Sequence, residues 1–205
     1  RIGFFHLRTK LGEYKLSAAT PMQRLKGRTL GLYGLGHTAR ALVPKAKAFG
    51  LNVIAHTASG NSYDTGVRMV SFHELLAESD FVSLHAPLTD STRGAFGRDL
   101  FSRMKPGAFL INTSRGGLVD EESLWSALQS NQIAGAALDV FQPEPPDLSK
   151  PLFRDERVII TPHAAFVSEE SILQMRTQAA QQVAAVLMGQ RPNNVINPQI
   201  YSPRV

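Results

Sequence analysis

Arg115, Glu144 and His163 each follow an apolar stretch in the C-terminal half of the chain. A carboxylate beside an imidazole holds one tautomer and stabilises the protonated ring, which is the arrangement of a general acid–base pair. An arginine adds a planar fork of N–H donors that matches a carboxylate. Taken singly, the three residues fit a solvated arginine, a loop glutamate and a capping histidine. A common location would instead predict a site that binds a carboxylate and transfers a proton.

The elements that must position these residues are short apolar runs alternating with helical patterns. Several runs are apolar throughout, which is typical of a parallel sheet covered on both faces. Alternation at this spacing predicts βαβ units and a doubly wound α/β fold. The expected strands are residues 29–33, 52–55, 67–70, 81–85, 108–112, 134–140 and 158–161. Because the carboxyl ends of parallel strands meet at one edge, the three residues above are expected to share that edge.

Helix boundaries are readable from capping residues. The segment Ser-Phe-His-Glu at 71–74 fits a capping box, and Asp120 begins another helix with two glutamates after it. A long helix is expected over 168–189, with Ser168 as its cap. Residues 1–21 predict part of a helix and a loop. Because 1–21 and the segment from 168 lie outside the βα core, we expect each to serve a neighbouring domain.

The segment LGLYGLGHTAR contains a G-x-G-x-x-A pattern at Gly34, Gly36 and Ala39, directly after an expected strand. Glycines at these places allow a tight turn and a close approach of the backbone to a pyrophosphate. The alternative interpretation is a tight turn between packed elements. Because strand and helix flank the pattern, it predicts a Rossmann-type dinucleotide-binding domain.

Thr57 stands where such domains usually carry an acid that holds the ribose 2′-hydroxyl. Loss of that carboxylate removes the repulsion that would exclude a 2′-phosphate. No arginine lies between His56 and Arg68 to clamp a phosphate, however. The choice between NAD and NADP therefore stays open at this point, with a slight preference for NAD.

Composition narrows the class of protein. The net charge of +5 comes from scattered Lys and Arg without a basic stripe interleaved with aromatics, so we do not expect nucleic-acid binding. There are 0 cysteines, which excludes disulfides, a thiol nucleophile and a cysteine-based metal site, and we assign no metal ligands. No apolar run is long enough for a membrane span and no signal peptide opens the chain. A soluble, cytoplasmic protein is expected.

Four ordered segments, LGLYGLGHTAR, NTSRGGLVDEESL, GAALDVFQPEPP and TPHAAF, resemble the NAD(P)-dependent D-2-hydroxyacid dehydrogenase family. The resemblance places Arg115, Glu144 and His163 on the family's catalytic arginine, glutamate and histidine. It also implies a set of residues in contact with the cofactor, from the glycine turn to the strand ends. These are Gly34, Gly36, His37, Thr38, Thr57, Ala86, Pro87, Thr92, Thr113, Ser114, Arg115, Asp139 and His163.

Within that set, the resemblance puts Thr113 and Ser114 near the nicotinamide and Asp139 on its carboxamide. An aspartate at the end of an apolar strand could instead cap a turn, but a buried carboxylate needs a partner and an amide would serve. The implied reaction is reversible hydride transfer between NAD(P) and C2 of a small 2-keto or D-2-hydroxy acid. A homodimer is expected by resemblance only.

The resemblance also implies a domain organisation. Residues 1–21 resemble the end of a hinge helix and its loop, 22–167 the dinucleotide-binding Rossmann domain, and 168–205 the return hinge helix and tail. The family's substrate domain, built mainly from N-terminal residues, is incomplete here, so a longer parent protein is expected and the fragment alone is expected to be impaired. The alternative function is a dinucleotide-sensing co-repressor of the same fold, similar to C-terminal-binding proteins.

Overall fold

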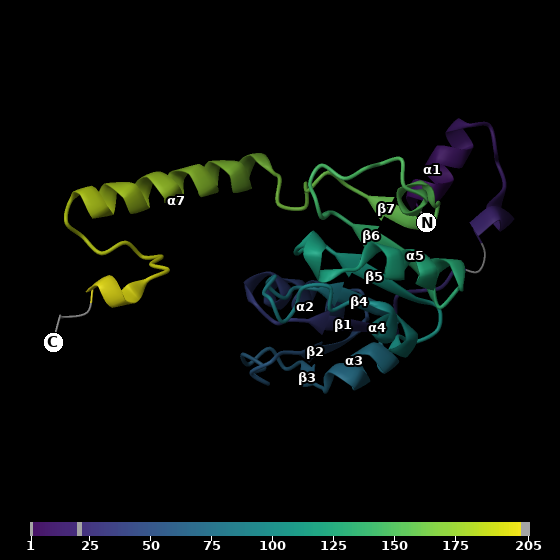
Figure 1. Cartoon of the computed structure of the whole chain (residues 1–205), viewed down its shortest axis with the longest axis horizontal. Helices are drawn as coiled ribbons and strands as arrows, with labels where there is room; N and C mark the ends of the chain where they lie inside the picture. The colour runs from purple at the N-terminus through teal and green to yellow at the C-terminus, as the bar shows by residue number, and fades with distance from the viewer. Residues whose placement is uncertain (1, 20–21, 202–205) are drawn as a thin grey trace. The chain divides into compact units, whose positions relative to one another are not determined.

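The structure is a computed structural model that describes residues 2–19 and 22–201. Its strands form one seven-stranded sheet in the order β3-β2-β1-β4-β5-β6-β7, and each pair of neighbours is parallel (Figure 1). The strands are β1 Thr29–Tyr33, β2 Asn52–His56, β3 Arg68–Met69, β4 Phe81–Leu84, β5 Ala108–Asn112, β6 Ile133–Leu138 and β7 Val158–Ile160. Because β1 lies between β2 and β4, the strand order reverses there, which is where such sheets bind ligands.

The predicted doubly wound parallel sheet is confirmed, with strand limits that differ from the expected ones by a few residues at most. The largest difference is in β6, which ends at Leu138 and leaves Asp139 and Val140 in the following loop. The apolar run alone could not mark this end, because Val140 is buried as fully as a strand residue. Buried loop residues extend an apolar pattern past the last ladder hydrogen bond.

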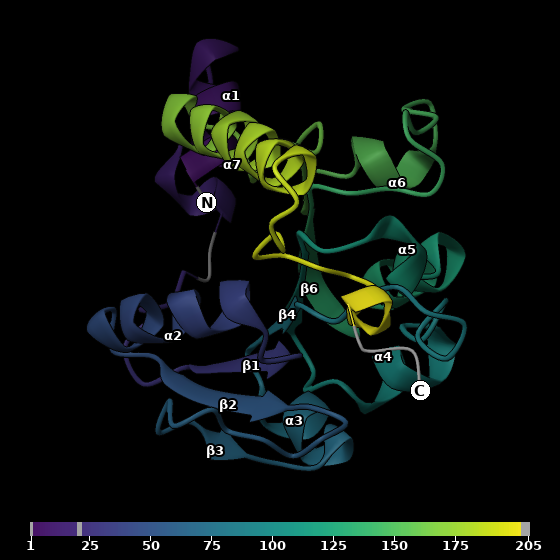
Figure 2. The same cartoon turned by 90° about the vertical axis from the view of Figure 1, so that its left-hand side faces the viewer.

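Helices cover both faces of the sheet. The helices of the described residues are α1 Ile2–Lys10, α2 His37–Ala48, α3 Phe72–Glu78, α4 Arg98–Arg103, α5 Glu121–Gln129, α6 Pro151–Arg154 and α7 Glu169–Leu187, with short 3₁₀ helices at Leu16–Ala19, Gly116–Leu118 and Pro198–Tyr201. A Cβ on Gly31 of β1 would meet Ser79, just after α3, whereas Leu30 and Leu32 pack with residues of α2. Since neighbouring residues of a strand point to opposite faces, α2 and α3 lie on opposite sides (Figure 2).

The apolar core lies in two clusters, one on each side of the sheet. The smaller cluster joins α2 to β1 and β2 through residues such as Leu32 and Val43. The larger joins α3, α4 and α5 to β4, β5 and β6 and contains Phe96 and Phe101, both almost fully buried. Burial of this extent fixes the strand ends in space, which is the condition for placing side chains at the sheet edge.

The predicted helix caps are confirmed. Ser71 and Glu74 form both hydrogen bonds of a capping box at α3. Asp120 accepts a hydrogen bond from the Ser123 N–H at the start of α5, and Ser168 caps α7 with Ser171 as its reciprocal partner. Each cap satisfies backbone N–H groups that a helix start leaves unpaired.

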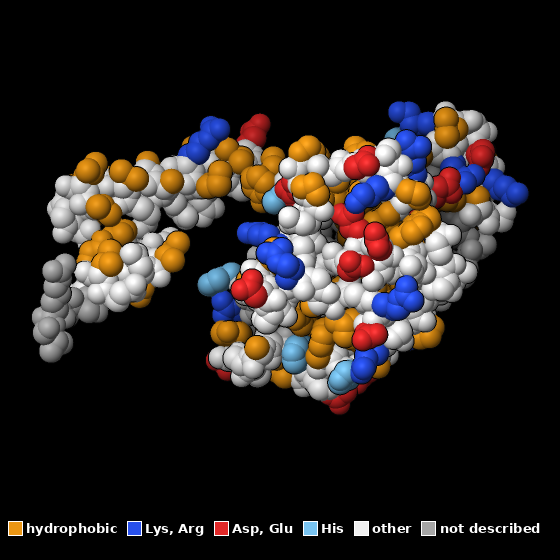
Figure 3. Space-filling model, viewed as in Figure 1, with side chains coloured by type: hydrophobic (Ala, Val, Ile, Leu, Met, Phe, Trp, Pro, Cys, Tyr) orange, Lys and Arg blue, Asp and Glu red, His pale blue; other side chains and the backbone are white. Residues whose placement is uncertain are grey.

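The chain divides into two compact units, the first ending at His163 and the second beginning at Ala164. In the first unit, Arg8 of α1 pairs with Glu156 in the segment before β7, at 2.6 Å. In the second unit, α7 has no buried residue. Over the face drawn in Figure 3, Lys and Arg side chains are intermingled with Asp and Glu. Within the described ranges, no helix is both long enough and apolar enough to cross a membrane.

Candidate functional site

The turn after β1 brings three strand ends together. Gly34 has φ +99°, a left-handed conformation that favours glycine, and its N–H donates to the His56 carbonyl oxygen at 2.9 Å. A Cβ at this position would lie 2.8 Å from the His85 backbone. Only a glycine therefore lets the ends of β1, β2 and β4 approach as they do.

The N-terminus of α2 follows this turn and is open. Gly36 is the N-cap residue in an extended conformation, no side chain caps the helix, and a Cβ on Gly36 would meet nothing within 4 Å. His37 and Thr38, the first helical residues, are exposed. Uncapped N–H groups and the positive end of the helix dipole form an anion site, so the residues present fit the pyrophosphate of a dinucleotide.

Thr57 follows β2 and is half-buried, with its Oγ1 3.4 Å from Ser59 Oγ. The sequence offered no arginine in this loop, but the structure brings one from α2. The Arg40 Cζ lies 4.6 Å from the ring centroid of Tyr63, in the same loop as Thr57. This contact joins residues that are distant in sequence, so no local pattern could reveal it.

The loops after β4 and β5 are joined by a hydrogen bond. Ser114 Oγ donates to the Ala86 carbonyl oxygen at 2.7 Å, and Thr92 Oγ1 donates to the Pro87 carbonyl oxygen at 2.8 Å. Ala86 is buried, whereas Pro87 and Thr113 are exposed. These predicted cofactor residues therefore lie on one connected rim at the carboxyl edge of the sheet.

Asn112 stiffens the loop that carries Arg115, a role that the sequence analysis missed. Its side chain is 0% exposed, its Nδ2 donates to the Arg115 carbonyl oxygen at 2.9 Å, and its Oδ1 accepts from the Ser114 N–H at 3.1 Å. A buried asparagine directly after an apolar strand is the signal that could have found it, since a buried amide needs partners. The Arg115 side chain is exposed and its Nη1 donates to the Ser114 carbonyl oxygen at 2.7 Å.

Gly116 brings the Arg115 loop against the loop after β6. A Cβ on Gly116 would lie only 2.1 Å from the Phe141 carbonyl group, so the two backbones touch. The Phe141 N–H in turn donates to Glu144 Oε1 at 2.9 Å. Close backbone approach therefore explains this glycine and connects the segment of Arg115 to that of Glu144.

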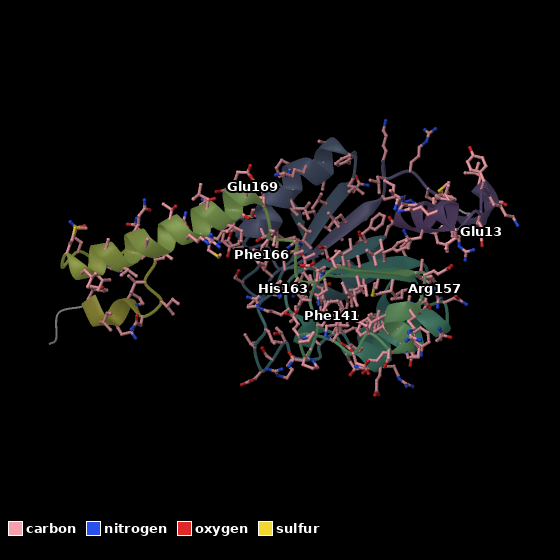
Figure 4. All side chains as sticks on the ribbon, turned by 90° about the horizontal axis from the view of Figure 1, so that it is seen from above. Glu13, Phe141, Arg157, His163, Phe166 and Glu169 are labelled. Carbon is pink, nitrogen blue, oxygen red and sulfur yellow. The ribbon has the colours of Figure 1, made fainter. Side chains whose placement is uncertain are left out.

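Glu144 and His163 form a pair across the loops after β6 and β7. His163 Nδ1 lies 2.8 Å from Glu144 Oε2, and both side chains are partly exposed. The hydrogen bond with His163, followed by that from the Phe141 N–H, holds the pKa of Glu144 below its ordinary value. In Figure 4, Phe141 and His163 lie toward one end of the sheet and Arg157, which precedes β7, toward the other.

The backbone of His163 is held in an uncommon conformation. Its φ is +53°, and its N–H donates to the carbonyl oxygens of Asp139 at 2.8 Å and Thr161 at 3.0 Å. Non-glycine residues rarely adopt this region, and such residues are frequent at functional sites. The Asp139 carboxylate, only 3% exposed, also accepts a hydrogen bond from Thr161 Oγ1. Asp139 thus has a protein partner, which the sequence analysis did not foresee.

The structure places Arg115, Glu144 and His163 after β5, β6 and β7, which are adjacent in the sheet. The expected common edge is therefore present. The glycine turn and Thr57 lie at the same edge, after β1 and β2. The chemical roles of these residues stay predictions.

Known proteins of the same fold define the class to which this chain belongs. A family model described as D-isomer specific 2-hydroxyacid dehydrogenase, NAD binding domain, matches residues 1–165. The chain is 40% identical over 181 residues to the glyoxylate reductase of Korarchaeum cryptofilum, covering 87% of this chain and 54% of that protein.

Two solved structures extend the comparison. The NAD-complexed D-isomer specific 2-hydroxyacid dehydrogenase of Lactobacillus delbrueckii ssp. bulgaricus has a TM-score of 0.87 and 33% identity, over 96% of this chain and 64% of that chain. An acyclic imino acid reductase in complex with NADPH and D-Arg has a TM-score of 0.86 and 30% identity, over 95% and 62%.

The chain therefore belongs to the NAD-binding-domain family of the D-isomer specific 2-hydroxyacid dehydrogenases. The predicted family and the predicted NAD-binding Rossmann domain are confirmed. The chain spans about half the length of the curated glyoxylate reductase, 54% of it. Substrate, partners and the activity of the whole protein are accordingly matters for proposal.

Proposed function

We propose that this protein is an NAD(P)-dependent D-2-hydroxyacid dehydrogenase that transfers a hydride between the nicotinamide and C2 of a small 2-keto acid. The observation that carries the proposal is the Glu144–His163 pair at 2.8 Å, on the sheet edge that also bears Arg115. An imidazole held by a carboxylate next to a carboxylate-binding arginine matches the needs of 2-keto acid reduction.

A dinucleotide held at this edge would supply the hydride in reduction and accept it in oxidation. Arg115 binds the substrate carboxylate through its planar N–H fork and polarises the neighbouring carbonyl. Because Glu144 holds Nδ1 of His163, we assign the proton exchange with the substrate to the opposite ring nitrogen, Nε2. His163 gives its proton to the forming alkoxide in reduction and removes the hydroxyl proton in oxidation.

We further propose that Asp139 orients the nicotinamide carboxamide and that Thr113 and Ser114 lie beside the ring. The burial of Asp139 and the hydrogen bond from Ser114 to Ala86 support this, because both fix the rim on which the ring would rest. The domain limits 1–21, 22–167 and 168–205 and the homodimer stay predictions. None of the described contacts favours the co-repressor alternative over the dehydrogenase.

The test is turnover of a panel of 2-keto acids by the full-length enzyme and by its Arg115→Ala and His163→Ala variants. We expect each variant to lose at least about 10²-fold in kcat/KM, the scale of general acid–base catalysis, while still binding NADH or NADPH. Near-normal turnover by either variant would overturn the assignment. Failure of the folded chain to bind either dinucleotide in calorimetry would overturn the whole proposal.

A further inference from the structure

The loop after β2, residues 57–66, lies where the adenosine ribose of a bound dinucleotide is expected. Domains selective for NAD place an acid at the end of this strand, which holds the ribose hydroxyls and repels a 2′-phosphate. Here two hydroxyl side chains, Thr57 and Ser59, occupy that place, with their oxygens 3.4 Å apart. Hydroxyl groups can donate to a phosphate oxygen, whereas a carboxylate cannot.

Arg40 adds a positive charge to this loop from the first turns of α2. Its Cζ lies 4.6 Å from the Tyr63 ring centroid, and its Nη2 lies 3.0 Å from His37 Nδ1. Neither of these partners is a carboxylate. A guanidinium stacked on a ring keeps its in-plane N–H donors available for a planar or tetrahedral anion.

The contact between Arg40 and His37 also determines the tautomer of the His37 imidazole. An arginine can only donate, so His37 Nδ1 must accept and the ring proton lies on Nε2. His37 is the first residue of α2, beside the open helix N-terminus. The two side chains thus offer N–H donors side by side, His37 from the first residue of α2 and Arg40 from beside the loop after β2.

We propose that Arg40, together with the hydroxyls of Thr57 and Ser59, binds the 2′-phosphate of the cofactor, so that this protein prefers NADPH to NADH. The inference rests on the proposed dinucleotide site and reverses the slight preference for NAD expected from the sequence. Two cations of α2 reach this loop, and Lys47 donates to the Thr65 and Gly66 carbonyl oxygens, each at 3.3 Å. Arg40 is the specificity-determining residue, because its contacts in the structure are with a ring and an imidazole. Asp64 lies next to Tyr63 in the same loop. Its carboxylate could hold the ribose hydroxyls and repel a 2′-phosphate, so the test includes a variant of it.

The experiment is calorimetric titration of the chain with NADPH and with NADH, for the wild type and for Arg40→Gln. We expect the wild type to bind NADPH at least about tenfold more tightly than NADH, the scale of one charge-assisted hydrogen-bonded contact. Arg40→Gln should lower NADPH affinity about tenfold and leave NADH affinity within about twofold. The matched control is Arg103→Gln, because Arg103 Nη1 also contacts a histidine Nδ1, that of His73 at 3.0 Å. It should change neither affinity.

Each other outcome has a defined meaning, provided that circular dichroism shows each variant to be folded. Equal affinities of the wild type for both dinucleotides would overturn this inference and leave the dinucleotide site standing. An equal loss of both affinities in Arg40→Gln would assign Arg40 to the pyrophosphate and also overturn it. Asp64→Asn tests whether Asp64 binds the ribose hydroxyls instead. A selective loss of NADH affinity in this variant would make Asp64 the ribose ligand and would overturn the inference. Binding of neither dinucleotide would overturn the proposed function itself.

Discussion

Glu144 is held from two sides, which makes it more than a counter-charge for His163. One carboxylate oxygen accepts the Phe141 N–H at 2.9 Å and the other faces His163 Nδ1 at 2.8 Å. The backbone contact fixes the side chain where the imidazole needs it. A residue fixed in this way can orient His163 without reorganisation during proton transfer.

Glu144→Gln should separate the effect of the Glu144 charge from the effect of the side chain's fixed orientation. The glutamine oxygen can still accept the Phe141 N–H, but the amide cannot stabilise a protonated imidazole. We expect kcat/KM for 2-keto acid reduction to fall about 10²-fold, with the dinucleotide Kd unchanged. Steady-state kinetics and calorimetry measure the two quantities.

The matched control is Glu156→Gln, whose carboxylate pairs with Arg8 in the segment before β7, away from the site. It should retain full turnover. A Glu144→Gln protein that turns over at the wild-type rate would contradict the assigned orientation of His163.

Asn112 offers a second test on a single residue, this time of the Arg115 loop. Asn112→Ala removes two hydrogen bonds of a fully buried amide and should lower the free energy of unfolding by about 2 kcal/mol. Asn112→Asp keeps the acceptor for Ser114 but loses the donor to Arg115 and buries a charge, so it should cost at least as much. Urea denaturation measures both.

Asn52 supplies the control for Asn112, because its exposed amide also donates to a backbone carbonyl, that of Gly27 at 3.1 Å. Asn52→Ala should change the stability by no more than about 0.5 kcal/mol. Equal losses in the free energy of unfolding for Asn52→Ala and Asn112→Ala would show that burial of the Asn112 amide adds nothing to the stability of the fold.

The turn between β1 and α2 contains two glycines. Gly34 is required by close backbone packing, whereas Gly36 leaves open space at the start of the helix. Gly34→Ala introduces a Cβ at 2.8 Å from backbone atoms and a strained φ, so we expect a large loss of stability in thermal unfolding. Gly36→Ala meets nothing within 4 Å and keeps a common φ of −72°, so its melting temperature should stay near that of the wild type.

Gly36→Ala should nevertheless weaken dinucleotide binding, because the added methyl group occupies the space that the pyrophosphate needs. Calorimetric titration with NADH and NADPH measures that loss. The result that would count against the proposed site is wild-type affinity in a folded Gly36→Ala protein.

At the level of elements, the sequence predicts the buried strands and the helix starts. It does not predict the side-chain contacts that join distant segments. The strands were readable because fully buried strands are apolar throughout, and the helix starts because caps such as Ser71 use local residues. Two contacts join segments that are far apart in the chain. Arg40 packs against the Tyr63 ring, and Thr161 donates a hydrogen bond to Asp139. No local period or spacing encodes such contacts, so they required the folded chain.

Across the whole molecule, the carboxyl groups with displaced pKa values form one consistent set. In the described part of the chain, every carboxyl pKa that departs from its ordinary value is lowered, because hydrogen bonds to the ionised form outweigh the opposing effect of burial. The groups are Glu74, Asp80, Asp120, Glu144, Asp147, Asp155 and Glu170. A lowered folded-state pKa stabilises the fold above the unfolded pKa and loses that effect as the pH falls. The protein should therefore be destabilised by acid below about pH 4.

Asp80 is the best single test of this behaviour because it joins three segments at the amino edge of the sheet. Burial alone would raise its pKa, but Lys105 at 2.8 Å, the Thr29 N–H at 2.8 Å and Arg28 at 3.0 Å bring the pKa below its ordinary value of 3.8. Asp80→Asn should lower the free energy of unfolding by about 2 kcal/mol at pH 7. The difference from wild type should shrink as the pH falls from the ordinary value of 3.8 to the lowered folded-state pKa, where the wild-type carboxyl also loses its charge.

Urea denaturation of both proteins between pH 7 and pH 3 would reveal this convergence, with the exposed Asp90 as the control position. Asp90→Asn should follow the wild-type curve over the whole range, since an exposed carboxyl gains little from folding. Parallel curves for the wild type and Asp80→Asn would mean that the charge of Asp80 does not stabilise the fold. Packing and the backbone ladders would then have to stabilise this edge of the sheet without Asp80, although three donors converge on its carboxylate, which is only 14% exposed.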